Sequence, residues 1–291
     1  MAGLQDIRRR IRSVKNTQQI TKAMKMISAV KLRKSQDRLL ALRPYAGKMA
    51  EVVRSVVAHF QDDGQALLPP IAQAFLAPRE ETRIRLVVVA SDKGLCGGFN
   101  ANLLKQAAAF LQSSPAALAH LDVVGKRALE WARKQRLDVQ REYLAIALPG
   151  LARVAEEIAE QAALQYERGE IDALYVVYTD FASALTQVPM IRRIFPLHLE
   201  EREPGTVEVP HLLEPSPGQV LSALFPRFIE TTLQHILLES SASEHGARMA
   251  AMDKASSNAE DMIARLTLNM NKIRQASITN QIIEIVSGAN A

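Results

Sequence analysis

One seven-residue register runs through the first sixty residues, and it limits the possible folds more than any other feature. Steps of alternately three and four residues from Leu4 to Phe60 give positions that are apolar at both ends and polar in the middle. Such a repeat makes a helix that pairs with another helix in a left-handed supercoil. Pro44 removes one backbone donor, but the register resumes unshifted, so we expect a kink there and not an end.

The last third of the chain carries the same register, from Leu221 to Ile273. At about 1.5 Å per residue, fifty or so residues span roughly 80 Å, which no compact domain of this mass could bury. The simplest arrangement is an antiparallel pair with the middle of the chain inserted at one end. If Val57 lies near Val220, the numbers of paired residues sum to about 277 along the whole seam.

This pairing predicts a narrow waist and an unpaired tip. The polar stretch 18–35 would face 242–259, which is rich in small residues. Residues after about Arg274 would have no partner within the chain, although the segment 278–286 is more apolar than an isolated helix end should be. We expect a socket made by another protein to hold this tip. The alternative is that the tip folds back on its own domain.

The middle of the chain alternates predicted strands and helices. Strands are expected at 84–90, 121–124, 139–146, 171–178 and 188–195, and helices at 100–112, 126–135 and 151–168. This alternation implies a largely parallel sheet that is covered on both faces. The predicted fold class is therefore α/β plus a long antiparallel coiled coil, with a central Rossmann-like domain inserted between the terminal helices. The expected divisions are a coiled-coil helix (1–60), a linker (61–82), an α/β domain (83–199), a second linker (200–218) and a coiled-coil helix with an apolar tip (219–287).

Positive charge is concentrated near the N-terminus. Residues 1–54 hold fourteen Lys/Arg and three Asp/Glu, a net charge of +11, whereas the whole chain has a net charge of +5. Nucleic acid, an anionic membrane or an acidic protein surface could each bind such a segment, and a solvated helix face is the alternative. No apolar run approaches the ~20 residues of a membrane span. The N-terminus has no apolar signal core, so we expect no cleaved leader.

The strongest candidate for chemistry is the glycine-rich turn from Ser91 to Asn100. It follows the first predicted strand and opens a helix, as a phosphate-binding turn does. Its spacing matches neither G-x-G-x-x-G nor G-x-x-x-x-G-K-[ST]. A nucleotide-binding enzyme that uses Gly94 to Gly98 therefore remains an alternative, beside a tight turn that lets the backbone pack closely.

The other reactive side chains form no convincing catalytic or metal-binding group. Cys96 is the single cysteine, which excludes a disulfide framework, and without a histidine nearby in sequence it is expected to be a small buried residue. His235 and Glu239 share a helix face, but two ligands alone make a weak metal site. We therefore predict no catalytic residue, no bound metal and no cofactor.

The basic waist is the most informative stretch of the sequence. A polar seam surrounded by cations, among them Lys34, is hard to explain by pairing within the chain alone. A basic coiled-coil adaptor for nucleic acid is one alternative. However, the aromatic residues that stack on single strands are absent from this stretch, and an antiparallel partner would cover one helix face.

Four motifs closely resemble the gamma subunit of the F-type rotary ATP synthase, and together they cover essentially the full chain. They are Ile20-Thr-Lys-Ala-Met-Lys-Met26 with Lys31-Leu-Arg33, Ser91-Asp-Lys-Gly-Leu-Cys-Gly-Gly-Phe-Asn100, Glu244-His-Gly-Ala-Arg-Met249 with Ala251-Met-Asp-Lys-Ala255, and Leu268-Asn-Met-Asn-Lys-Ile-Arg-Gln-Ala-Ser-Ile-Thr-Asn-Gln-Ile-Ile-Glu-Ile285. The resemblance implies an antiparallel coiled coil with an α/β domain at its foot.

The resemblance also implies a function and a set of partners. It implies a non-catalytic rotor shaft that turns inside a ring of alpha and beta subunits and couples ion flow to ATP synthesis or hydrolysis. The implied partners are the alpha and beta subunits, the epsilon subunit and the membrane c-ring, with no nucleic acid and no cofactor. The implied location is the cytoplasmic face of a bacterial inner membrane, as a peripheral protein. This chain has no second cysteine and no inserted segment of the kind that chloroplast members carry, so their redox switch is not expected.

Contacts with the catalytic ring are carried over residue by residue. Acidic beta-subunit loops would meet the basic waist, and the C-terminal tail would turn in a mostly apolar collar. The residues implied in these contacts are Arg8, Arg9, Lys22, Met24, Lys25, Lys31, Arg33, Arg265, Arg274, Gln275, Ile278, Ile282 and Ile285.

Overall fold

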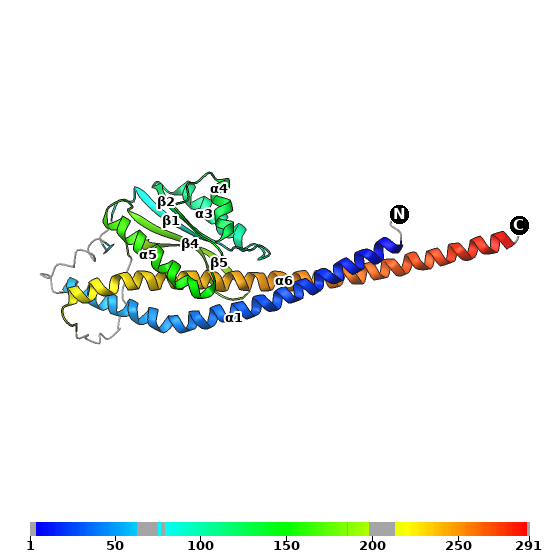
Figure 1. The fold of residues 1–291 in the computed structure, drawn as a ribbon, viewed down its shortest axis with the longest axis horizontal. Helices are drawn as coiled ribbons and strands as arrows, with labels where there is room; N and C mark the ends of the chain where they lie inside the picture. Colours follow the sequence, from blue (N-terminus) through cyan, green and yellow to red (C-terminus); the bar gives the residue numbers. More distant parts are fainter. Residues whose placement is uncertain (1–3, 63–74, 77–78, 185, 198–212, 290–291) are drawn as a thin grey trace.

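Two long antiparallel helices and one α/β domain make up the molecule (Figure 1). A computed structural model describes residues 4–62, 75–76, 79–184, 186–197 and 213–289. Helix α1 (Leu4–Asp62) and helix α6 (Pro217–Ala289) run along each other, and the α/β domain lies against one half of the pair. The predicted fold class is confirmed.

The register of the helix pair agrees with the predicted sum of about 277. Thr21 Oγ1 lies 2.7 Å from Ser256 Oγ, Lys25 Nζ lies 2.6 Å from Asp253 Oδ1, and Ser35 Oγ lies 3.2 Å from Ser241 Oγ. The numbers in each pair sum to within one of the predicted value. The seven-residue pattern, with Val57 placed near Val220, therefore predicted which residues of the two chain ends meet.

Both long helices continue through their prolines. Pro44 lies inside α1 and Pro226 lies inside α6, so neither proline ends a helix. A glycine inside a helix costs about 1 kcal/mol of helix stability relative to alanine, yet Gly246 lies inside α6, where it has a packing role. A Cβ built on Gly246 would lie 3.3 Å from both the Cα and the carbonyl oxygen of Ala184, so glycine lets α6 approach this turn closely.

The α/β domain has a five-stranded sheet in the order β3-β2-β1-β4-β5. Strands β1, β2, β3 and β4 are parallel where they pair, and β5 pairs antiparallel with β4. The short connection between β4 and β5 explains the antiparallel edge, since a parallel crossover needs a dozen or more residues. The strands are β1 (Arg83–Val89), β2 (Ala117–Val124), β3 (Arg141–Tyr143), β4 (Ala173–Phe181) and β5 (Gln187–Phe195).

Helices cover both faces of this sheet. One core joins side chains of α3 (Phe99–Ser113) and α4 (Lys126–Lys134) to one face, and a second core joins α5 (Leu151–Glu167), α1 and α6 to the other. A short 3-10 helix, Leu148–Gly150, precedes α5. The second core contains Val53 of α1 and Phe225 of α6 beside Val176 of β4, and all three side chains are buried. The foot of the helix pair and the sheet therefore share one apolar core.

Two local features depart from the sequence expectations. The strand expected at 139–146 spans only Arg141–Tyr143. Arg85, which stands in an otherwise apolar run, is 1% exposed, and its Nη2 donates to Asp122 Oδ2 at 2.5 Å. Burial raises the pKa of Asp122, and the charge of Arg85 opposes this shift. The buried charge of Arg85 is tolerated because its partner, Asp122, is buried beside it.

The two predicted linkers fall mainly on residues outside the described ranges. Of 61–82, the structure describes 61–62, 75–76 and 79–82, and of 200–218 it describes 213–218. Phe75 is buried and lies 4.7 Å from Phe195 between ring centroids, so part of the first segment packs into the domain core. Within the described residues, no helix combines the length and the apolar character that crossing a membrane requires.

Candidate functional site

The waist of the helix pair has a buried polar seam. Thr21, Ser28 and Ser35 follow one another at seven-residue spacing on α1, and each is at most 8% exposed. Across the seam lie the buried side chains of Ala242 and Ser256 on α6. Small side chains let the two backbones approach, and the hydroxyl groups of Thr21, Ser35 and Ser256 find partners across the seam or on their own helix. The predicted slim and weakly apolar waist is confirmed.

Most of the predicted contact cations on α1 point away from the seam. The exposed ones are Arg8, Arg9, Lys22, Lys31 and Arg33. Lys25 differs, because its Nζ forms an ion pair with Asp253 Oδ1 at 2.6 Å across the two helices. Met24 is half-buried. The outer surface of the waist therefore carries uncovered positive charge, with Lys25 partly committed within the chain.

Exposed apolar side chains accompany these cations, and our sequence analysis missed them. Ile20, Met26, Ile27 and Val30 are between 57% and 71% exposed on α1. They are not positions of the register that begins at Leu4. Together they form a second apolar stripe beside the seam, and this stripe is the sequence signal that could have revealed them. A surface that combines cations and apolar side chains is typical of a protein interface.

The tip of α6 extends beyond the end of α1 (Figure 1). Ile278 is 49% exposed and Ile282 is 55% exposed, so the expectation that they have no partner within the chain is confirmed. The extended path of α6 contradicts the alternative in which the tip folds back on its own domain. Of the other predicted contacts near the tip, Arg265, Arg274 and Gln275 are exposed, whereas the side chain of Ile285 is outside those described.

The glycine-rich turn at 91–100 uses its polar groups internally. Asp92 Oδ1 accepts a hydrogen bond from the backbone nitrogen of Lys126 at 3.0 Å, where α4 begins. A carboxylate thus occupies a helix N-terminus of the kind that phosphates use in nucleotide-binding domains. Asn100 and Ser91 bond to each other, and Cys96 is buried, as expected. The turn is therefore a packing element, which disfavours the nucleotide-binding alternative.

Arg248 of α6 fixes this turn to the helix pair, and its role was missed from the sequence. Its guanidinium donates to the carbonyl oxygens of Lys93 at 2.8 Å and Gly94 at 3.2 Å, and pairs with Glu244 at 2.7 Å. Burial, together with the positive charges of Arg248 and Lys31, lowers the pKa of the neighbouring His245 to about 4. Burial also raises the pKa of Glu244, against the effect of Arg248. The cluster is a buried electrostatic joint between two parts of the molecule.

The candidate metal pair is the remaining chemical feature. His235 Nδ1 lies 3.6 Å from Glu239 Oε2. Across the described ranges, no group of three or more His, Cys, Asp or Glu side chains is arranged to hold a metal ion. Within those ranges the described side chains therefore offer binding surfaces at the waist and the tip, and the helix pair holds these surfaces apart.

Comparisons with known proteins cover the whole chain. The family model described as ATP synthase matches residues 3–291. The ATP synthase gamma chain of Solibacter usitatus is 45% identical over 291 residues, covering 100% of this chain and 99% of that one. The gamma chain of Pelotomaculum thermopropionicum is 40% identical, with the same coverage of both chains.

Solved structures have the same fold at lower sequence identity. A chain of the Tetrahymena thermophila mitochondrial ATP synthase central stalk and c-ring gives a TM-score of 0.59 at 23% identity, covering 81% of this chain and 99% of that one. A chain of the Euglena gracilis mitochondrial ATP synthase gives a TM-score of 0.64 at 17% identity, covering 99% and 94%. With full-length matches at 40–45% identity, the chain belongs to the gamma-chain family of ATP synthases.

Proposed function

We propose that this chain is the central rotor shaft of a membrane-attached F-type ATP synthase and couples ion flow to ATP synthesis or hydrolysis. One observation carries the proposal, namely the match to ATP synthase gamma chains over 100% of this chain and 99% of theirs. The shaft itself is a non-catalytic subunit, and ATP is made or hydrolysed on the alpha and beta subunits that surround it.

The shape of the molecule supplies a physical basis for coupling. Identical catalytic sites can differ at one moment only if something asymmetric touches them. The helix pair is asymmetric, since α1 carries exposed cations and apolar side chains on its outer surface. Rotation of such a surface would shift the preference of each site between its nucleotide states through differential contacts.

The proposed contacts divide between the two ends of the molecule. The ring of alpha and beta subunits would contact Arg8, Arg9, Lys22, Met24, Lys25, Lys31 and Arg33 of α1, and Arg265, Arg274, Gln275, Ile278, Ile282 and Ile285 of α6. The α/β domain would meet the epsilon subunit and the membrane c-ring. In this arrangement the protein is peripheral, at the cytoplasmic face of a bacterial inner membrane.

A charge reversal on the waist tests the proposal. Lys22→Glu with Lys25→Glu would place two carboxylates where the proposal requires cations. We expect the assembled complex to form and to hydrolyse ATP, while ATP-driven proton pumping into inverted membrane vesicles falls at least about tenfold, as loss of several charge-assisted contacts predicts. A matched control, Lys22→Arg with Lys25→Arg, changes the same two side chains but keeps their charge, and it should pump as the unmodified complex does. Normal pumping by the waist variant would contradict the proposed contact.

A further inference from the structure

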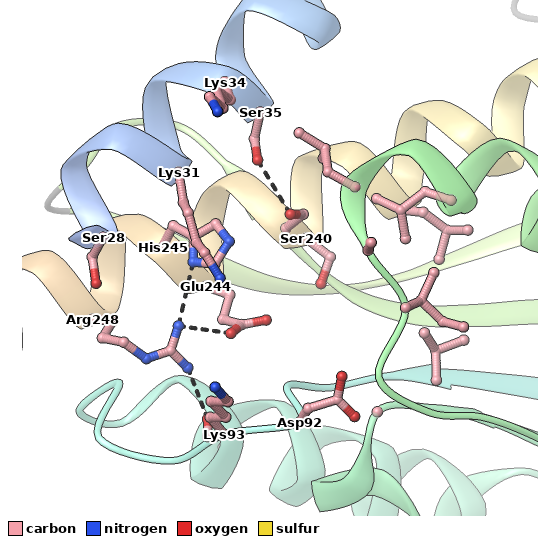
Figure 2. A pocket seen from close by; sticks show the side chains of 18 of the residues that line it. Ser28, Lys31, Lys34, Ser35, Asp92, Lys93, Ser240, Glu244, His245 and Arg248 are labelled. Carbon is pink, nitrogen blue, oxygen red and sulfur yellow. Dashed lines mark hydrogen bonds and ion pairs between the residues drawn. The ribbon is translucent and has the colours of Figure 1, made fainter. Parts of the chain in front are cut away.

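A cavity of about 1000 Å³ lies between the helix pair and the carboxyl edge of the sheet. Figure 2 shows it with α1 and α6 on one side and the turn at Asp92 and Lys93 on the other. Its lining includes Ala90 and Gly125, which directly follow β1 and β2. The carboxyl ends of parallel strands and the interfaces between structural units are where α/β proteins most often hold small ligands.

One wall of this cavity is apolar. Val89, Val124 and Leu237 come from the sheet and from α6, and Ile146 and Leu148 come from the loop that precedes α5. Arg38 of α1 donates from Nη1 to the carbonyl oxygen of Leu148 at 2.9 Å, which ties this loop to the helix pair. The wall is therefore held in place by contacts on both of its sides, as a preformed binding pocket requires.

The other wall is polar, and the cavity lining carries more positive than negative side chains, five Lys or Arg against three Asp or Glu. Of the three carboxylates, Asp92 caps α4, Glu244 pairs with Arg248, and Asp37 is exposed. Lys31, Lys34 and Lys93 also line the cavity, and within the described part of the chain their Nζ atoms form no hydrogen bond or ion pair. In Figure 2, the side chain of Lys31 reaches down from α1 beside His245 and Glu244.

We propose that this cavity binds a free, small amphiphilic anion. Its acidic group would meet the lysines, and a compact apolar body of about ten to twenty heavy atoms would lie against the aliphatic wall, as the cavity volume allows. This inference goes beyond the rotor function. Because the walls come from α1, α6 and the sheet edge, a bound ligand would link the helix pair to the α/β domain and stabilise their relative positions.

Binding of octanoate to the purified full chain tests the proposal, with octan-1-ol as the neutral ligand of equal chain length. We expect octanoate to bind saturably in calorimetric titrations, with a dissociation constant on the order of 0.1 mM for ten heavy atoms. Octan-1-ol should bind about tenfold more weakly, because it lacks the charge that the lysines would pair. Equal affinity for the two ligands would overturn the proposal.

Two variants locate the binding in this cavity. Lys31→Met keeps most of the length of the side chain and removes its charge, so it should weaken octanoate binding about tenfold and leave octan-1-ol binding unchanged. Ala147→Trp places a large ring at the exposed edge of the cavity lining and should abolish saturable binding of both ligands. Ala101→Trp, on the exposed side of α3, is the matched control and should bind as the unmodified chain does.

The outcomes separate the cavity from other apolar surfaces of the chain. Undiminished octanoate binding by a folded Ala147→Trp variant, checked by circular dichroism, would overturn the proposal. If that variant does not fold, the Lys31→Met result decides, and unchanged octanoate affinity there would overturn it as well. The assay contains no ring subunits, so its failure would leave the proposed rotor function untouched.

Discussion

The two halves of the helix pair are stabilised in different ways. At the foot, Val53 and Val56 of α1 and Phe225 and Leu233 of α6 are at most 2% exposed and join the core of the α/β domain. At the waist, hydroxyl groups and small side chains fill the seam, and apolar residues such as Met26 face solvent. Beyond the N-terminal end of α1, α6 continues alone (Figure 1). The stability of the molecule therefore rests on its foot, whereas the waist and tip leave apolar side chains exposed.

This difference has a physical reason. Burial of apolar area stabilises a helix in proportion to the area removed from water, and the foot has a sheet and α5 to pack against. The waist has only one partner helix, so little area is available to bury. A thin shaft whose outer side chains face other subunits needs such a waist, and it depends on the foot for its order.

The largest effect should come from emptying the core at the foot. Phe225 is 0% exposed, and its ring centroid lies 5.6 Å from that of Phe75. We expect Phe225→Ala to lower the free energy of unfolding by about 3–5 kcal/mol, because it removes a buried ring and leaves a cavity. Urea denaturation followed by circular dichroism measures this loss. Leu268→Ala near the tip, at a side chain that is 71% exposed, should change it by less than about 0.5 kcal/mol. Equal losses of unfolding free energy in the two variants would show that the foot does not stabilise the molecule more than the tip does.

The Arg248 cluster, which joins the helix pair to the turn at 91–100, should show the next largest effect on stability when the pH is changed. The pKa of His245 is lowered from 6.5 to about 4, so the unfolded chain binds a proton there that the folded chain does not. The stability that this group contributes is present above pH 6.5 and is lost as the pH falls towards 4. Between pH 7 and pH 5 the unmodified chain should therefore lose about 1–2 kcal/mol more than His245→Gln.

Denaturation of both chains at several pH values measures that difference. Subtracting the variant removes the contributions of other titrating groups, including Glu244, whose pKa is raised by burial. Parallel pH profiles for the two chains would show that the pKa of His245 is the same in the folded and the unfolded chain, contrary to its placement between Arg248 and Lys31.

The polar seam at the waist should give a smaller effect than the apolar foot. Thr21→Val removes the 2.7 Å contact with Ser256, while Ser256 still donates to the carbonyl oxygen of Met252 at 2.9 Å. We expect a loss of about 1 kcal/mol on denaturation, and a smaller loss when Ser256→Ala is added, because the second hydroxyl is then removed with the first. A single-variant loss as large as that of Phe225→Ala would mean that the waist is no weaker than the foot.

The ion pair across the waist should have the smallest effect. The side chains of Lys25 and Asp253 are 43% and 62% exposed, so solvent screens their attraction. In a double-mutant cycle of Lys25→Ala and Asp253→Ala, we expect a coupling of less than about 0.5 kcal/mol, and weaker still at 1 M salt. A salt-independent coupling above this value would show that the waist is closed more tightly than its exposure indicates.

The periodic parts of the fold were predictable from sequence, and the contacts between elements were not. The seam positions of α1 and α6 followed from the seven-residue spacing, and their pairing followed once the two ends that flank the inserted domain, Val57 and Val220, were placed side by side. The buried Arg85–Asp122 pair and the Arg248 contacts join residues that are far apart in sequence, so no local pattern could reveal them. For the candidate surface, the cations were found by composition, whereas Ile20 and Val30 were missed because we followed one stripe of α1 only.

The pairing of the two chain ends also determines the order in which the molecule can be completed during synthesis. Thr21 meets Ser256 across 235 positions of sequence, so α1 leaves the ribosome long before its partner helix exists. Contacts of such separation form slowly, and the unpaired apolar stripe of α1 is meanwhile exposed to other chains. A newly made N-terminal helix therefore keeps its apolar stripe unpaired until the last third of the chain has been translated.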